Sequence, residues 1–249
     1  MTVPSLDATG KVVLVTGGSK GLGRAMALGF AEAGADLVVA SRKLGPCEEV
    51  ADEVRATGRR ALAVSCHVGD WEQCAALVDA TVTEFGRIDV LVNNAGIAPV
   101  PPSLLEITED LFDKTIAVNL KGSLRLTALA AEHMPAGGSI INISSKASLH
   151  PTPFTVVYAA AKAGLNALTK AAASELGPRG IRVNAIVCGT FRTGSLHASL
   201  PTEEMRQQMA ANISLGRIAS PDEIVGTALF LASDASSYLT GELILLDGG

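Results

Sequence analysis

Tyr158 and Lys162 are four residues apart and together could transfer a proton. They lie in the alanine-rich run after Pro153, which predicts a helix, and residues four apart share one helix face. A free phenol has a pKa near ~10, and a neighbouring ammonium favours the phenolate and lowers that pKa. Chance places lysine four residues after about one tyrosine in fifteen. The value of the pair therefore depends on a cofactor site elsewhere in the chain.

Ser145 adds a hydroxyl at the end of a predicted strand. The apolar run from Ser139 to Ser144 is typical of a buried strand. Open α/β sheets bind their ligands beyond the carboxyl ends of the strands, which is where Ser145 falls. Ser145 is therefore a candidate for contact with a ligand.

A glycine-rich turn follows the first predicted strand, which begins at Lys11. The turn runs from Thr16 to Gly23 and leads into an amphipathic helix over 24–33. Glycines let a pyrophosphate approach the amino end of a helix. The spacing is G-x-x-x-G-x-G rather than G-x-G-x-x-G, and an ordinary glycine turn is the alternative. The strand before it and the helix after it favour a dinucleotide site.

The second predicted strand, over 36–42, ends in residues that bear on the type of dinucleotide. An acidic residue at this place binds the ribose 2′-hydroxyl of NAD, whereas an arginine accommodates a 2′-phosphate. Ser41 and Arg42 stand here, and Lys20 adds a positive charge in the glycine turn. The pattern predicts NADP(H) as the preferred cofactor and NAD(H) as the alternative. A solvated basic loop would also explain these residues.

Alternating strands and helices predict the fold. Further strands are expected at 61–66, 88–93, 139–144 and 181–187 and from Glu242 onward, with Asp70 as the N-cap of a helix to Phe85. Asn119 lies within a long helical stretch over 103–133, and a solvent-facing position is its simplest interpretation. The irregular segment at about 190–215 is typical of a substrate lid. We predict one Rossmann-type α/β domain over 1–249, with a doubly wound, seven-stranded parallel sheet covered by helices on both faces.

Composition excludes several classes of function. The chain is 48% hydrophobic and 18% charged, with a mean hydropathy of +0.34, as a sheet covered on both faces requires. A net charge of −5 without a basic block argues against nucleic-acid binding. No run reaches the ~18 apolar residues of a membrane span, and no signal peptide is evident. The cysteines show no CxxC pattern and predict reduced thiols in a cytoplasmic protein without a metal site: Cys47, Cys66, Cys74 and Cys188.

Together these motifs resemble those of the short-chain dehydrogenase/reductase family over essentially the whole chain, and the bacterial 3-oxoacyl-[acyl-carrier-protein] reductases in particular. The resemblance is carried by Thr16-Gly17-x3-Gly21-x-Gly23, Asn93-Asn94-Ala95-Gly96, Asn119, Ser145-x12-Tyr158-x3-Lys162, the stretch from Asn184 to Thr193, and Leu246-Asp247-Gly248-Gly249. Each motif is modest, but their shared order and spacing are specific.

The resemblance implies an NAD(P)-linked interconversion of a ketone and a secondary alcohol (EC 1.1.1.-). Tyr158 would exchange a proton with the carbonyl oxygen while a hydride moves to or from nicotinamide C4. Ser145 would orient that oxygen. Lys162 would hold the nicotinamide ribose and lower the tyrosine pKa, and Asn119 would position a water of the proton relay.

The resemblance also implies the binding residues and a homotetramer. The expected cofactor contacts are Gly17, Ser19, Lys20, Gly21, Leu22, Gly23, Ser41, Arg42, His67, Val68, Asn94, Ala95, Gly96, Tyr158, Lys162, Gly189, Thr190 and Thr193. Loops at the carboxyl ends of strands supply the expected substrate contacts, which are Ala98, Ser145, Leu149, His150, Phe154, Tyr158, Phe191 and Leu196. This mostly apolar set favours a hydrophobic or acyl-type small molecule.

Two residues depart from the family pattern. His67 stands where the family usually has aspartate, and Cys188 stands where it usually has proline, so we expect a thiol near the cofactor that alkylating agents reach. Two alternatives to the leading function stay open. One is an NAD-linked alcohol, sterol or polyol dehydrogenase, and the other is a non-catalytic dinucleotide-binding subunit.

Overall fold

Strands and helices alternate along the chain, as the sequence predicts. The computed structural model describes residues 5–194, 196, 200 and 202–249. Its strands are β1 (Val12–Thr16), β2 (Asp36–Ser41), β3 (Ala61–Ser65), β4 (Val90–Asn93), β5 (Ser139–Ser145), β6 (Arg182–Cys188) and β7 (Leu243–Leu246). Its α-helices include α1 (Gly21–Glu32), α2 (Leu44–Ala56), α3 (Trp71–Phe85), α4 (Glu109–Ile116), α5 (Gly122–Glu132), α6 (Val156–Leu176), α8 (Glu203–Ala211) and α9 (Val225–Ala232).

The strands form one parallel, seven-stranded sheet in the order β3-β2-β1-β4-β5-β6-β7. The order changes direction beside β1, which pairs with β2 on one side and with β4 on the other. Ligands of doubly wound sheets bind at this point, beyond the carboxyl ends of the strands. The predicted Rossmann-type fold is confirmed.

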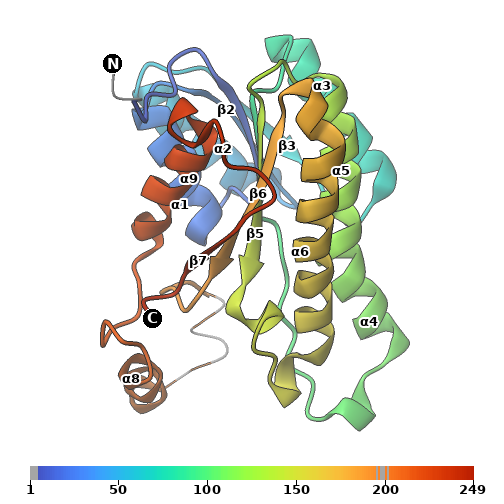
Figure 1. Cartoon of the computed structure of the whole chain (residues 1–249), viewed down its shortest axis with the longest axis vertical. Helices are drawn as coiled ribbons and strands as arrows, with labels where there is room; N and C mark the ends of the chain where they lie inside the picture. The colour runs from blue at the N-terminus through green and yellow to red at the C-terminus, as the bar shows by residue number, and fades with distance from the viewer. Residues whose placement is uncertain (1–4, 195, 197–199, 201) are drawn as a thin grey trace.

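Each face of the sheet has its own apolar core. Successive side chains of a strand point to opposite faces, so Val13 and Val15 belong to one core and Leu14 to the other. Helices α1, α2 and α9 cover the first face, and α3, α5 and α6 cover the second (Figure 1). Phe30 of α1 and Leu77 of α3 are fully buried, which stabilises the fold by about 1.5–3 kcal/mol for each side chain. The two cores hold the strand ends in fixed positions.

The predicted helical stretch over 103–133 is interrupted. A 3₁₀ turn (Leu104–Glu106) and α4 are followed by a π-helical turn (Ala117–Lys121) before α5 begins. π-helical turns are rare and often occur at functional sites. The wider turn directs Asn119 inward, and its side chain has no exposed area. The interpretation of Asn119 as a solvent-facing residue is therefore wrong.

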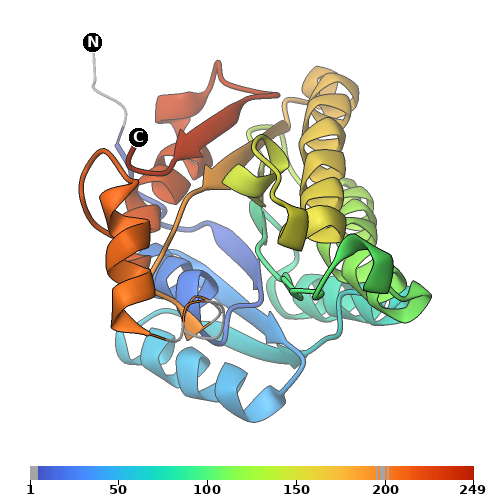
Figure 2. The same cartoon turned by 90° about the horizontal axis from the view of Figure 1, so that it is seen from below.

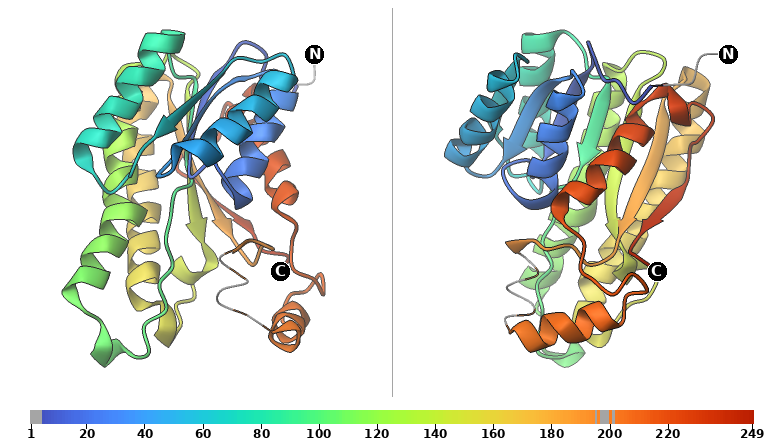
Figure 3. Two further views of the ribbon diagram at one scale, coloured as in Figure 1. Left: turned by 180° about the vertical axis from the view of Figure 1, so that it is seen from behind. Right: turned by 90° about the vertical axis from the view of Figure 1, so that its left-hand side faces the viewer.

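Helices and loops extend past the carboxyl ends of the strands. Figure 2 looks onto that end of the molecule, and Figure 3 shows α4 and α8 reaching beyond the sheet on opposite sides. Helix α8 belongs to the segment predicted as a lid, and a bridge between Phe191 and Ala219 joins the start of that segment to the chain just beyond it. Its residues 195, 197–199 and 201 lie outside the described part. Within the described part, no helix is long and apolar enough to cross a membrane.

Candidate active site

The glycine turn between β1 and α1 is too tightly packed for side chains. A Cβ on Gly23 would lie 2.2 Å from the carbonyl oxygen of Gly17 and 2.5 Å from Asn94 Nδ2. Gly17 itself has φ +63°, which favours glycine. The N-cap of α1, Lys20, makes no side-chain capping bond, and the first turn carries no acid. Its backbone N–H groups are therefore suited to an anion, so the turn fits the pyrophosphate of a dinucleotide.

Thr16 ties this turn to the segment after β4. Its hydroxyl donates to Val92 O (3.2 Å) and accepts from the backbone N–H groups of Asn94 (3.0 Å) and Ala95 (3.1 Å). The Asn94 side chain in turn donates to the carbonyls of Thr16 (2.9 Å) and Gly17 (3.2 Å). The expected contacts Asn94, Ala95 and Gly17 are thus brought together. Sequence reasoning missed the role of Thr16, although a hydroxyl at the carboxyl end of a strand was the available signal.

Three cations lie in the connections that follow β1 and β2. Lys20, Arg42 and Lys43 are exposed, and their side chains have no hydrogen-bond or ion-pair partner among the described residues. The Ser65 hydroxyl donates to Arg42 O (3.1 Å) and thereby orders the backbone of this loop. Ser41 takes the position at which an acid would select a free ribose. These cations suit a phosphate group.

Lys162 is almost fully buried beneath the carboxyl end of β5. Its Nζ donates to Ile143 O (2.7 Å) and lies 5.9 Å from the centroid of the Tyr158 ring. Burial lowers the pKa of Lys162 to about 8. Gly96 keeps the space open, because a Cβ there would lie 3.7 Å from Lys162 Nζ and 2.9 Å from Asn119 Oδ1. The structure thus brings Gly96, Lys162 and Asn119 together.

Tyr158 is half-buried beside Ser145. Burial raises the pKa of its phenol, and a hydrogen bond with Ser145 opposes that rise. The opposing contribution thus comes from Ser145 rather than from Lys162, so the expectation that Lys162 lowers the tyrosine pKa is not met. Lys162 is itself buried, and its ammonium donates to Ile143 O.

Asn119 holds the loop after β4. Its Nδ2 donates to the carbonyls of Ile97 (2.8 Å) and Thr115 (3.0 Å), and its Oδ1 accepts from the backbone N–H of Ile97 (3.1 Å). Both N–H groups of the amide are thus occupied, which leaves one lone pair of Oδ1 for a water. The clamp fixes the backbone that follows Gly96.

The remaining expected cofactor contacts lie at the ends of β3 and β6. His67 is half-buried, and Val68 is buried against the start of α5, where a Cβ on Gly122 would lie 2.3 Å from Val68 O. After β6, Gly189 N donates to Leu246 O (2.9 Å), which anchors the loop that includes Thr190. The same loop reaches the glycine turn, because Thr193 Cγ2 lies 3.5 Å from the position of a Cβ on Gly21.

Cys188 is buried, and its thiol stays protonated at neutral pH. The residue is the last of β6 and pairs with Ser145 and Leu246 in the sheet. Burial raises the pKa of its thiol to about 12, and Lys162 opposes this only in part. Because the thiolate is the reactive form, the expectation that alkylating agents reach Cys188 is not supported.

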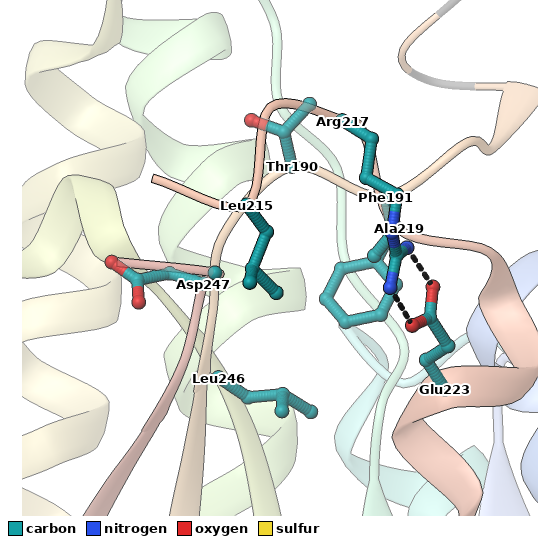
Figure 4. A pocket seen from close by; sticks show the side chains of 9 residues that line it. Thr190, Phe191, Leu215, Arg217, Ala219, Glu223, Leu246 and Asp247 are labelled. Atoms are coloured by element: carbon teal, nitrogen blue, oxygen red, sulfur yellow. Dashed lines mark hydrogen bonds and ion pairs between the residues drawn. The ribbon is translucent and has the colours of Figure 1, made fainter. Parts of the chain in front are cut away.

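The expected substrate contacts differ in exposure. Leu149 and Phe154 are 44% and 55% exposed, Ala98 and His150 are also exposed, and Leu196 is half-buried. Phe191 is buried in the core of the first sheet face, so the structure gives it a packing role. Figure 4 shows its ring in a pocket that is also lined by Arg217 and Glu223, whose side chains form an ion pair.

Comparisons with known proteins find relatives along nearly the whole chain. A family model described as enoyl-(acyl carrier protein) reductase matches residues 17–249. An L-rhamnose 1-dehydrogenase (NAD(P)(+)) of Sphingomonas sp. (strain SKA58) is 39% identical, with 96% of each chain covered. The 3-oxoacyl-[acyl-carrier-protein] reductase FabG of Thermotoga maritima is also 39% identical, over 96% of this chain and 97% of that protein.

Solved structures show the same fold. A short-chain type dehydrogenase/reductase from Mycobacterium marinum is 38% identical, with a TM-score of 0.91 over 98% of this chain and 96% of that chain. A blue fluorescent protein from a metagenomic library, solved in complex with NADPH, is 34% identical, with a TM-score of 0.92 over 98% of both chains. Both matches cover 98% of this chain.

Proposed function

The chain belongs to the short-chain dehydrogenase/reductase family, whose members are oxidoreductases that act on alcohols and ketones with a nicotinamide cofactor, and we propose that Tyr158 is its general acid and base and NADP(H) its preferred cofactor. The observation that carries this proposal is the convergence of Ser145, Tyr158 and Lys162 at the carboxyl end of β5. The glycine turn at the end of β1 supplies the dinucleotide site that this arrangement needs.

The raised pKa of Tyr158 suits proton donation. In the direction of reduction, the phenol stays protonated at neutral pH and gives its proton to the oxygen of the former carbonyl. The Ser145 hydroxyl donates a hydrogen bond to the same oxygen and so stabilises the charge that develops there. The nicotinamide, when bound, supplies or accepts the hydride. In the direction of oxidation Tyr158 must first lose its proton, which its hydrogen bond with Ser145 favours.

The preference for NADP(H) rests on the charges at the end of β2. Arg42 and Lys20 would pair with a 2′-phosphate by charge-assisted hydrogen bonds, and Lys43 adds to the local potential. The related protein that was solved with NADPH supports the preference for NADP(H). The name of the related L-rhamnose dehydrogenase includes NAD(P)(+), so NAD(H) stays the alternative cofactor. His67, Val68, Gly189, Thr190 and Thr193 complete the proposed cofactor contacts.

The substrate is proposed to be a hydrophobic or acyl-type ketone or alcohol. Exposed Leu149 and Phe154 at the mouth of the site favour apolar contact, and the segment over 190–215 would close over it. The L-rhamnose dehydrogenase relative favours a second candidate, a sugar or another polyol. We further propose a homotetramer, because α4, α5 and β7 each expose a large apolar side chain that a subunit contact could cover, namely Phe112, Leu124 and Leu245. A cytoplasmic location is proposed as well.

The test replaces Tyr158 with phenylalanine. A spectrophotometric panel of ketones, alcohols and sugars with NADP(H) and NAD(H) first identifies a substrate for the natural chain. With that substrate, Tyr158→Phe is expected to lower kcat by about 10²–10⁴-fold, the usual contribution of a general acid or base, and to leave the cofactor Kd unchanged. Undiminished turnover in the variant would refute the assignment. A natural chain that binds the dinucleotide and turns over no member of the panel would favour the non-catalytic subunit.

A further inference from the structure

Helix α6 carries a third polar side chain on the face that holds Tyr158 and Lys162. Asn166 lies four residues after Lys162 and eight after Tyr158, a spacing that places all three along one side of a helix. Asparagine is mildly unfavourable inside a helix, yet Asn166 is only 7% exposed. A buried amide requires hydrogen-bond partners, and both ends of this one find them at the carboxyl end of β5.

The partners of Asn166 flank Ser145 on both sides. Ser144 Oγ donates to Asn166 Oδ1 (2.6 Å), and Asn166 Nδ2 donates to Ser148 Oγ (2.8 Å). Ser148 Oγ then donates to the carbonyl oxygen of Ser145 (2.6 Å). The bonds therefore run in one direction, from Ser144 through the amide of Asn166 and the hydroxyl of Ser148 to the carbonyl of Ser145. Ser144 is buried as well, so little water competes for these bonds.

This chain of hydrogen bonds ends on the backbone carbonyl of Ser145, whose hydroxyl faces Tyr158. Ser145 caps the short 3₁₀ turn Lys146–Ser148, and its Oγ accepts from Ala147 N (3.2 Å). That acceptor bond leaves the hydroxyl proton free to be shared with Tyr158 or a substrate oxygen. The turn keeps its geometry because Ser148 is bonded to Ser145 and is itself held from α6 by Asn166. Helix α6 thus carries Tyr158 and is also linked, through Asn166 and Ser148, to the backbone of Ser145.

We propose that Asn166 is a positioning residue, which acts through Ser144 and Ser148 to hold Ser145 in line with Tyr158. The proposal rests on the function proposed above for Ser145 and Tyr158. A misplacement of about 1 Å in a catalytic group lowers rates by roughly 10²-fold, so the loss of this link is a kinetic defect and not only a loss of stability.

The test compares two buried polar residues of α6. Asn166→Leu keeps the branched shape of the side chain and removes both bonds. Thr169→Val is the matched control, because Thr169 is buried on the same helix and accepts from Asn142 of the same strand (2.9 Å), without a link to Ser145. We expect both variants to lose thermal stability. Only Asn166→Leu is expected to lower kcat, by about 10–100-fold, with the cofactor Kd within about twofold of the natural value.

A second readout does not depend on a substrate. The chain has two tyrosines, and Tyr238 is fully exposed, so the Tyr238→Phe background leaves Tyr158 as the sole phenol. Its ionisation can be followed by ultraviolet absorbance. Because Ser145 opposes the rise in the pKa of Tyr158, Asn166→Leu is expected to shift the titration to higher pH, and Thr169→Val to leave it in place. The titration tests the positioning role of Asn166 even if no substrate is found. Failure to find a substrate would count against the proposed function alone.

Ser148→Ala is a second test of the same link, for the case that Asn166→Leu does not fold. It breaks the same link at its other end, so it should lower kcat and raise the Tyr158 pKa in the same sense. Adding Asn166→Leu to it should cost little further activity, since residues that act in one network are not additive. Fully additive losses, or an Asn166→Leu protein with natural kcat and an unshifted phenol titration, would overturn the proposal.

Discussion

Replacing Gly23 with alanine tests whether the glycine turn is a close-packed dinucleotide cradle. The new Cβ would lie 2.2 Å from the carbonyl oxygen of Gly17, which is more than about 1 Å inside normal contact. That oxygen cannot turn away freely, because Asn94 Nδ2 donates to it (3.2 Å) and would itself lie 2.5 Å from the methyl group. Overpacking of this kind lowers the free energy of unfolding by about 1–3 kcal/mol. The loss should lie near ~3 kcal/mol here, because the contact is with the held backbone of Gly17.

Two measurements follow from that cost. For a chain of this size about 1 kcal/mol shifts the Tm by roughly 2–4 °C, so Gly23→Ala is expected to lower the Tm by about 6–12 °C. The displaced backbone should also weaken NADPH binding by at least about tenfold, as measured by fluorescence titration. Gly226→Ala in α9 is the control, because a Cβ there meets no atom within 4 Å. It should raise stability by about 0.5–1 kcal/mol. A Gly23→Ala protein with the natural Tm and natural affinity would refute the packing argument.

Three further predictions concern charge and titration. Arg42→Asp should lower kcat/KM for NADP(H) by about 10–100-fold, the worth of a charge-assisted hydrogen bond, and an unchanged NADP(H)/NAD(H) ratio would contradict the assignment. The pKa of Lys162 is lowered to about 8 from an ordinary value of 10.5, so the unfolded chain binds more protons between these values and folding stability rises with pH across that window. Urea unfolding at several pH values should show this rise in the natural chain but not in Lys162→Met. Any loss of activity in iodoacetamide at pH 8 should proceed at equal rates in the natural chain and in Cys188→Ala, because burial raises the thiol pKa to about 12; a slower loss in the variant would show that the thiol is accessible.

Local patterns in the sequence were enough to predict the elements that carry the site. The glycine turn needs only the order of strand, glycines and helix, and the pairing of Tyr158 with Lys162 on one face needs only the helical period. Asp70 was predicted as an N-cap, and its side chain accepts from the backbone N–H groups of Glu72 and Gln73 (3.0 Å each). Such features depend on residues a few positions apart, whose geometry the backbone sets by itself.

Interactions between distant segments decided what the sequence could not. Asn119 turns inward because its amide binds Ile97, which is 22 residues away along the chain. Burial acts on Tyr158 and Cys188 through the elements packed around them, and it reverses the pKa direction expected for the tyrosine.

Sequence alone therefore determined which side chains this protein presents and which secondary-structure elements carry them. Tertiary structure decided which of these side chains are buried away from water and which form hydrogen bonds, as Asn166 does with Ser144 and Ser148. The physical reason is that desolvation and hydrogen bonding depend on the neighbours in space, and most of these neighbours are far apart in the sequence.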